Sequence, residues 1–110
     1  MNYAEMTDFE INKAVLSVLS KFPVHPTPRG GGSAAGAPVS KNSILHWFDF
    51  CNSWADAGPI IADNTISLIH GHGFWDAMTD DGSVVSTDES NPLRAAMIVF
   101  LMMQEKPDAA

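Results

Sequence analysis

The sequence predicts an α+β fold, a two-layer sandwich in which helices pack on one face of a small three-stranded antiparallel sheet. Three observations lead to this prediction. A helix-capping signal opens an amphipathic segment near the amino end, three β-prone stretches separated by turn residues occupy the second half, and an apolar helical segment follows them. The expected order is helix, loop, helix, three strands, helix, and 110 residues fit one domain rather than two independent cores.

The first expected helix runs from about Asp8 to Ser20. In Thr7-Asp8-Phe9-Glu10, the threonine side chain and the glutamate three residues later satisfy each other's free backbone donors, which is a capping box. Pro23 and the prolines after it stop the helix, and Arg29 to Gly36 is glycine-rich and has no apolar periodicity. We therefore expect a flexible loop at about residues 23–43 that is dispensable for folding.

The segment between this loop and the strands is harder to assign. Ile44 to Phe48 is too short for its periodicity to distinguish a strand from a helical turn. Asn52 is a suitable cap for a second helix through Ser53 to Ala57. Pro59 removes one backbone donor, so it should bend or end that helix. Helix two is therefore expected to be short and kinked.

Three strands and a third helix complete the expected fold. The strands are expected at residues 66–69, 74–78 and 84–86. Asn91 caps a helix from Leu93 to Glu105, with Pro92 in the favoured first position. This helix is apolar on all sides. It is either the central core helix, under helix one and the sheet, or part of it forms a dimer seam, and the two interpretations can both hold.

Charge and cysteine content limit the functions to consider. Thirteen acidic and six basic residues give a net charge of −7, which repels phosphate backbones, so we expect no generic nucleic-acid binding. The longest apolar run, residues 95–103, is too short to span a membrane. The single cysteine, Cys51, cannot form an internal disulfide, and no secretory signal opens the chain, so we expect a cytoplasmic protein.

Cys51 is the first candidate for chemistry. It is followed by Asn52 and lies near His46 in the sequence, as a thiol nucleophile with a histidine base would require. A buried and inert cysteine is the better interpretation, because nothing here indicates the positive surroundings that lower a thiol pKa. We expect no catalytic residues and no enzyme activity.

His70 and His72 are the candidates for metal binding. In an extended chain they project to the same side, where Asp76 or His46 could complete a site. This segment alone supplies two ligands, fewer than the three or four that zinc needs. We interpret both histidines as solvated turn residues, and we expect neither a metal nor a cofactor.

The predicted ligand site lies at the amino end of the third helix. Asn91 and the free N–H groups of the first turn carry partial positive charge there, and Arg94 adds a full one. Trp54 beside Asp56, or Trp75, would supply an aromatic wall with polar tips. The predicted occupant is a small anionic or nucleotide-like ligand. Arg94→Ala is expected to weaken its binding and leave the fold intact.

Both anion-binding features have a simpler interpretation. Arg94 could pair with a surface carboxylate such as Asp88 or Glu89. The glycine run from Arg29 to Gly36 could wrap an anion with its backbone N–H groups, but it lacks the lysine and the preceding strand of a phosphate-binding loop. We interpret that run as a linker.

Four distinctive segments of the chain carry a resemblance to a known family. They are Met1 to Lys13, Phe48 to Ile61, Ile66 to Ile69 and Asn91 to Met103. In this order they resemble the NinX family, small proteins of lambdoid phages and enterobacterial prophages that form a domain of unknown function. The resemblance implies a phage or prophage protein. It implies no activity that could be transferred to individual residues.

These observations lead to a binding protein rather than an enzyme. The first hypothesis is a host-modulating, counter-defence protein of the infected or lysogenic bacterial cytoplasm that binds a small nucleotide-like ligand. The alternative is an acidic interaction module that binds a host or phage protein through its surface or through the third helix. A homo-oligomer is compatible with both hypotheses.

Overall fold

The fold, seen in a computed structural model that describes residues 2–105, is built around one central helix. In chain order the elements are a 3₁₀ turn at Tyr3–Glu5, α1 at Asp8–Leu19, a 3₁₀ turn at Arg29–Gly31, β1 at Ala35–Pro38, β2 at Leu45–Phe48, α2 at Trp54–Asp63, β3 at Ser67–Gly71, β4 at Phe74–Met78, β5 at Val85–Glu89 and α3 at Pro92–Glu105. The α+β class and the three-stranded antiparallel sheet are confirmed.

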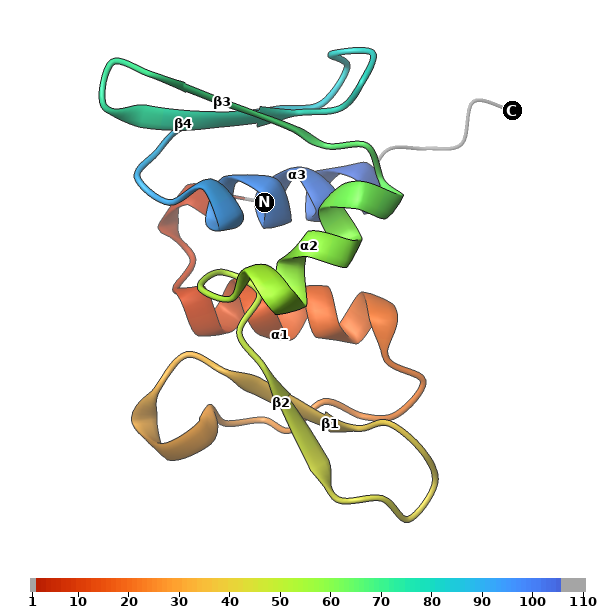
Figure 1. The fold of residues 1–110 in the computed structure, drawn as a ribbon. Coiled ribbons are helices and arrows are strands. Elements are labelled where there is room, and N and C mark those ends of the chain that lie inside the picture. Colours follow the sequence, from red (N-terminus) through yellow and green to blue (C-terminus); the bar gives the residue numbers. More distant parts are fainter. Residues whose placement is uncertain (1, 106–110) are drawn as a thin grey trace.

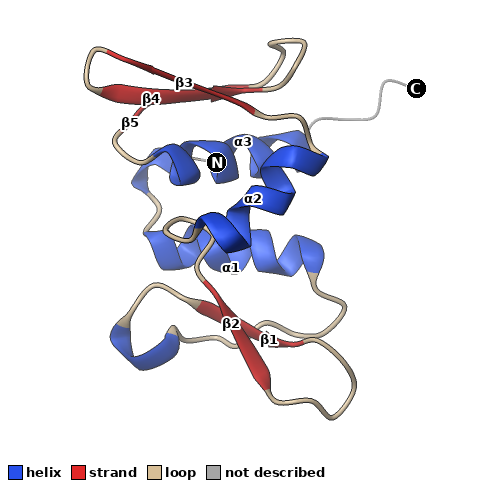
Figure 2. Ribbon diagram, in the orientation of Figure 1, coloured by secondary structure: helices blue, strands red, loops and turns tan. Residues whose placement is uncertain are grey.

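The elements form stacked layers (Figure 1 and Figure 2). The sheet β3-β4-β5 covers one side of α3, and α1 packs against α3 from the other side. A second sheet, the antiparallel hairpin β1-β2, lies beyond α1, while α2 contacts α3. The hairpin is a layer that the predicted two-layer sandwich did not include.

Helix α1 begins where the sequence predicts. The Thr7 hydroxyl accepts a hydrogen bond from the Glu10 backbone N–H at 3.1 Å, and the Glu10 carboxylate accepts one from the Thr7 N–H at 3.0 Å. Ile11 and Val15 then face the core and have no exposed surface. The capping box is therefore confirmed, and it fixes the direction in which α1 enters the core.

The second helix differs in two respects from the prediction. Ser53, not Asn52, is the cap, because its hydroxyl accepts the Asp56 backbone N–H. The helix also continues to Asp63, four residues past Pro59, so the proline does not end it. The ambiguous segment before it is settled as a strand, β2, because Leu45 to Phe48 pairs with β1.

The predicted loop at about residues 23–43 needs correction, because β1 lies inside it. Ala35 and Ala37 have almost no exposed surface, and β1 packs against α1. Opposite them, Gly36 pairs with Trp47, and a Cβ on Gly36 would lie 2.8 Å from the indole ring. Small side chains are thus required on both faces of this strand, which is why the segment shows no apolar pattern.

Helix α3 is the core helix, the first of the two alternatives predicted for it. Eight of its residues are buried, including the whole stretch from Ala95 to Leu101. The sheet, α1 and α2 all contact it. A helix that is apolar on all sides needs this cover, and the dimer seam stays a prediction.

Candidate functional site

A polar network joins α1 to the segments on either side of the hairpin. The side-chain amide of Asn12, which has no exposed surface, donates hydrogen bonds to the Ser33 backbone carbonyl at 3.0 Å and to Asp49 Oδ1 at 2.8 Å. The Asn12 amide oxygen accepts the backbone N–H of Cys51 at 3.0 Å. Ser33 Oγ donates to Asp49 Oδ2 at 2.7 Å. Each buried polar atom here has a partner, so this network is structural.

Arg94, predicted to bind an anion, is held in a cage of acceptors. Its Nε donates to Glu89 Oε1 at 2.7 Å and its Nη1 donates to Asp8 Oδ1 at 2.8 Å. Its Nη2 donates to backbone carbonyls of the amino-terminal segment, those of Tyr3, Ala4 and Met6. The pairing with Glu89 is the simpler interpretation offered by the sequence. Two carboxylates already neutralise this guanidinium.

The N–H groups of the first turn of α3 are also engaged. Asn91 Oδ1 accepts the N–H groups of Leu93 at 2.8 Å and Arg94 at 3.3 Å, and its backbone carbonyl accepts that of Ala95. Pro92 has no N–H to offer. The anion site at this helix end stays a prediction, but every donor on which it relies already has an acceptor.

The two tryptophans predicted to wall that site come from different elements, and the strand register pairs Trp75 with Glu89, the carboxylate that binds Arg94. Trp54 begins α2 and is 59% exposed, whereas Trp75 lies on β4 and contacts the ring of His70 at a centroid distance of 4.8 Å. Within residues 2–105, no hydrogen bond or ring contact joins either indole to Arg94. Asp56, by contrast, binds the backbone N–H of Asp49 through Oδ2 at 3.0 Å.

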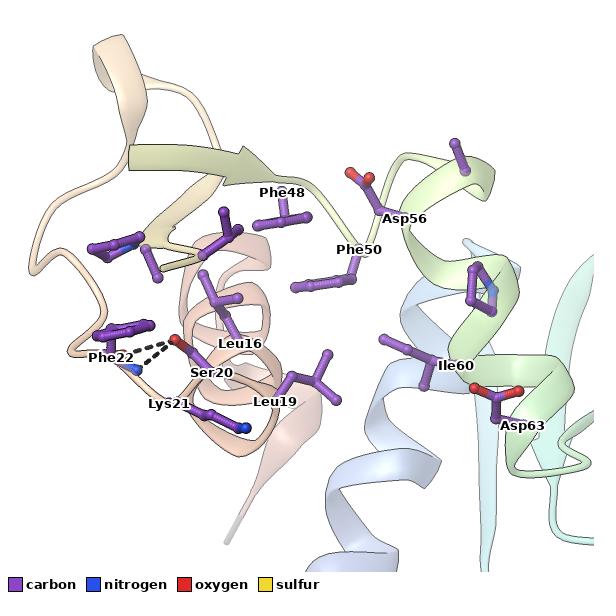
Figure 3. Close-up of a pocket in the computed structure, with 15 residues that line it drawn as sticks. Leu16, Leu19, Ser20, Lys21, Phe22, Phe48, Phe50, Asp56, Ile60 and Asp63 are labelled. Atoms are coloured by element: carbon purple, nitrogen blue, oxygen red, sulfur yellow. Dashed lines mark hydrogen bonds between the residues drawn. The ribbon is translucent and has the colours of Figure 1, made fainter. Parts of the chain in front are cut away.

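The described residues form a groove bounded by the carboxyl end of α1, the hairpin and α2 (Figure 3). It has a volume of about 610 Å³. One face of α2 forms one wall along the length of that helix. The groove is lined mainly by apolar side chains and prolines: Leu16, Leu19, Ser20, Lys21, Phe22, Ala37, Pro38, Val39, Phe48, Phe50, Ala55, Asp56, Pro59, Ile60 and Asp63. We call it the α1–α2 groove.

Two stacked rings lie at the hairpin side of the α1–α2 groove. Phe48 and Phe50 are parallel to within 2°, with centroids 5.6 Å apart (Figure 3). Charged groups lie at the edge: Lys21 after α1, and Asp56 and Asp63 on α2. The groove therefore offers aromatic and aliphatic surface at its centre and an excess of negative charge at its rim.

Exposed apolar side chains gather around the α1–α2 groove. They are Val18 and Leu19 at the end of α1, Val39 and Ile44 flanking the hairpin turn, and Trp54 at the start of α2. Ile44 is 81% exposed and Val39 is 58% exposed. Each of the five lines the groove or belongs to a segment that does. Leu19 and Val39 line the groove itself, and exposed apolar surface within a groove is typical of a binding surface.

A second exposed apolar surface is the outer face of the three-stranded sheet. The strand register places Ile69 opposite Asp76, Phe74 opposite Gly71, and Val85 opposite Met78. Ala77 on the other face is buried against α3. None of these residues lines the α1–α2 groove, and the carboxylate of Asp76 lies among them, so the α1–α2 groove is the stronger candidate site.

Cys51 and the histidines do not form a reactive centre in the described residues. Cys51 has no exposed surface, and burial raises the pKa of its thiol to about 12. His46 and His72 are exposed, and His72 lies in the turn between β3 and β4 with a positive φ of 53°. Across residues 2–105, no three histidine, cysteine or acidic side chains are grouped so that they could hold a metal ion.

Sequence reasoning found one charged residue of the groove, Asp56, and missed its walls. Leu19 and Phe22 follow the core-facing positions of α1, and Phe48 lies in the segment that periodicity could not assign. The sequence signal for the groove was Val18-Leu19 at the end of the first helix. One face of that helix already packs into the core, so two further apolar side chains there indicate a second apolar surface.

One comparison with known proteins identifies the chain's relatives. The family model described as Bacteriophage P22, NinX, matches residues 2–104. A search of curated proteins finds no match to this chain. In the part that the structure describes, none of the helices has both the length and the apolar character needed to cross a membrane.

Proposed function

Because the chain belongs to the NinX family of bacteriophage proteins, we propose that it is a phage accessory protein that acts by binding, and that the α1–α2 groove receives an apolar segment of a partner protein. The observation that carries this proposal is the exposed apolar surface in the lining of the groove, to which Leu19 and Val39 contribute. Exposed apolar side chains gain most from being covered, and a partner segment covers a rim as well as a pocket.

The charge of the groove supports a protein partner over a nucleotide-like ligand. The rings of Phe48 and Phe50 would accept a flat base, but the lining includes one cation, Lys21, against the carboxylates of Asp56 and Asp63. A phosphate would therefore approach a net negative rim on a chain of net charge −7. The nucleotide-like ligand is the second candidate, supported by the stacked rings alone.

A binding role also agrees with the chemistry of the buried side chains. The thiol of Cys51 has its pKa raised by burial, so it lacks the thiolate that a nucleophile needs. The carboxylates of Asp8 and Glu89 are paired with Arg94. These groups stabilise the fold, and the proposal assigns them no catalytic step.

Site-specific photo-cross-linking tests the proposal in bacteria that carry the phage or prophage. A benzophenone amino acid placed at Val39, on the rim of the groove, should yield one discrete cross-linked protein. The same group at Thr87, an exposed position on β5 outside the groove, is the matched control and should not yield that product. Equal products from both positions, or none from position 39, would contradict a docking site in the groove.

A variant in the groove then tests whether the cross-link depends on the apolar lining. Leu19→Asp changes a side chain that is 48% exposed, so the fold should tolerate it, while the cross-link from position 39 should disappear. Ile69→Asp, on the outer sheet face with the same exposure, should leave the cross-link unchanged.

A thermal-shift panel of nucleotides tests the second candidate, the nucleotide-like ligand. That candidate gains support if a nucleotide raises the melting temperature and Phe48→Ala abolishes the shift.

A further inference from the structure

We infer that the partner segment is basic as well as apolar, and that it places cationic side chains against Asp56 and Asp63 at the two ends of the α1–α2 groove. This inference rests on the proposed docking of a partner protein in that groove. It adds the chemical character of the partner, which neither the family nor the apolar lining supplies.

The two carboxylates are spaced along one wall of the groove. Asp56 lies in the first turn of α2 and Asp63 at its end, and both line the groove (Figure 3). They are seven positions apart in the sequence, which is two helical turns or about 10 Å along the axis. Pro59 and Ile60 lie between them and line the same wall. The wall therefore presents negative, apolar and negative surface in that order.

No cation within residues 2–105 compensates these charges. The ion pairs of this part of the chain are those of Arg94 with Asp8 and with Glu89. Lys21 lines the groove but forms no ion pair with either carboxylate of α2. Asp56 Oδ2 accepts the Asp49 backbone N–H, which leaves its Oδ1 for a partner. A cationic side chain would find charge complementarity at both ends of the groove.

The charge of the whole chain narrows the choice of occupant. A net charge of −7 attracts a basic partner over a distance set by the salt concentration. A second copy of this chain would bring another −7 to the same rim, so it is a poor occupant. Nucleic acid is disfavoured for the same reason. A basic and apolar protein segment satisfies both the lining and the charge.

The spacing of the two carboxylates also favours a helical partner segment. An α-helix that lies alongside α2 with basic residues seven positions apart would reach Asp56 and Asp63 together. Its apolar residues at the third and fourth positions between them would face Pro59, Ile60 and the Phe48 ring. The inferred partner is therefore an amphipathic helix with one apolar stripe flanked by lysine or arginine.

Three labelled helical peptides of about fourteen residues test this chemistry by fluorescence anisotropy. They share one apolar stripe and carry Lys, Gln or Glu at two positions seven apart. The Lys peptide should bind about tenfold more tightly than the Gln peptide, and the Glu peptide more weakly still. Added salt should reduce the difference. A fourth peptide, with the same lysines three apart, should lose the advantage if the spacing matters.

Charge reversal on the protein provides the matched control. Asp63→Lys should lower the affinity for the Lys peptide and raise that for the Glu peptide, whereas Asp80→Lys, outside the groove, makes the same change in net charge and should leave the order unchanged. An equal effect of both variants would overturn the inference, because a general field would then explain the preference.

The outcomes separate this inference from the proposed function. Equal binding of all peptides, with backbone NMR shifts at Leu19, Phe48 and Ile60, would overturn the basic character and leave the groove as docking site. Tight binding of the Lys peptide with shifts elsewhere would overturn both. A cross-link from position 39 to a second copy of the chain would also overturn the inference, since that partner is acidic.

Discussion

The side-chain amide of Asn12 donates a hydrogen bond to Asp49 Oδ1 at 2.8 Å, although 37 residues separate them in the sequence. The same amide reaches the Ser33 carbonyl and accepts the Cys51 N–H, so one buried side chain connects α1 to the segments before β1 and after β2. The hairpin supplies one wall of the α1–α2 groove, so this contact also positions the proposed binding site.

Asn12→Ala should therefore destabilise the protein by about 3 kcal/mol, because it leaves the Cys51 N–H without its acceptor and removes one of the donors to the Asp49 carboxylate. Urea denaturation measures this loss. Lys13→Ala, one residue later and without a side-chain hydrogen bond, should change the free energy of unfolding by less than about 0.5 kcal/mol. Equal stability of the two variants would show that the network contributes little.

Arg94→Ala should unfold the amino-terminal segment and lower stability by about 3–5 kcal/mol. The variant leaves the carboxylates of Asp8 and Glu89 facing each other without a cation. This corrects the expectation that the fold would remain intact. Arg94→Lys keeps the charge but lacks the planar fork, so it should recover only part of the loss. Hydrogen exchange should report faster opening at residues 3–8, and unchanged exchange there would contradict the structural role.

Local signals in the sequence predicted some elements well. The capping box of Thr7 and Glu10 and the apolar character of α3 depend on residues close in sequence, so they could be read from the chain alone. The strand β1 could not, because Ala35-Gly36-Ala37-Pro38 has no β-branched or aromatic residue. Its pairing with β2 and its contact with α1 make it a strand, and both are tertiary.

The candidate site was predictable to a smaller extent. Asp56 was selected from the sequence and lines the groove, and Trp54 lies exposed at the start of the same helix. The proposed anion site at Arg94 depended on free donors, and apart from Glu89 and Asn91 the acceptors that engage them come from residues about 90 positions away. Distant backbone carbonyls leave no pattern in a sequence, so this cage could not be foreseen.

Gly36→Ala should destabilise the hairpin by about 1–3 kcal/mol, because the new Cβ would lie 2.8 Å from the Trp47 ring and force it to move. Trp47 also contacts His25 at a centroid distance of 5.8 Å, so its displacement would disturb the approach to β1. Thermal unfolding followed by tryptophan fluorescence is the measurement.

Gly58→Ala is the control for that substitution. Gly58 lies inside α2, and apart from its two chain neighbours a Cβ there would meet nothing within 4 Å. Alanine gains about 0.5–1 kcal/mol over glycine in a helix interior, but the ring of Pro59 crowds the Cβ of the residue before it and should offset part of this gain. Opposite signs for the two glycines are expected, and a stabilising effect at position 36 would show that the Trp47 ring moves aside at little cost.

Acid should weaken the start of α1 through Glu10. The backbone N–H of Thr7, and then its side chain, hold the pKa of the Glu10 carboxyl below its ordinary value of 4.5. A lowered folded pKa means that this contribution is present above pH 4.5 and is lost as the pH falls through the folded pKa. Glu10→Gln should therefore reduce the slope of unfolding free energy against pH in this range. An unchanged slope would show that the carboxylate contributes nothing.

Cys51 should resist alkylation by iodoacetamide at pH 8 for as long as the protein stays folded. Burial first, and then the negative charge of Asp8, raise the pKa of the thiol to about 12, against the opposing effect of Arg94. At pH 8 about one molecule in ten thousand would then carry a thiolate, and no surface of Cys51 is exposed to the reagent. Ser17→Cys, exposed on α1, should react at the rate of a free thiol in the Cys51→Ala background. Because the folded pKa exceeds the ordinary value of 9.0, stability should fall as the pH rises above about 9, and Cys51→Ala should lessen that fall. Rapid labelling of folded Cys51 at pH 8 would reveal a reactive thiol and reopen the case for catalysis.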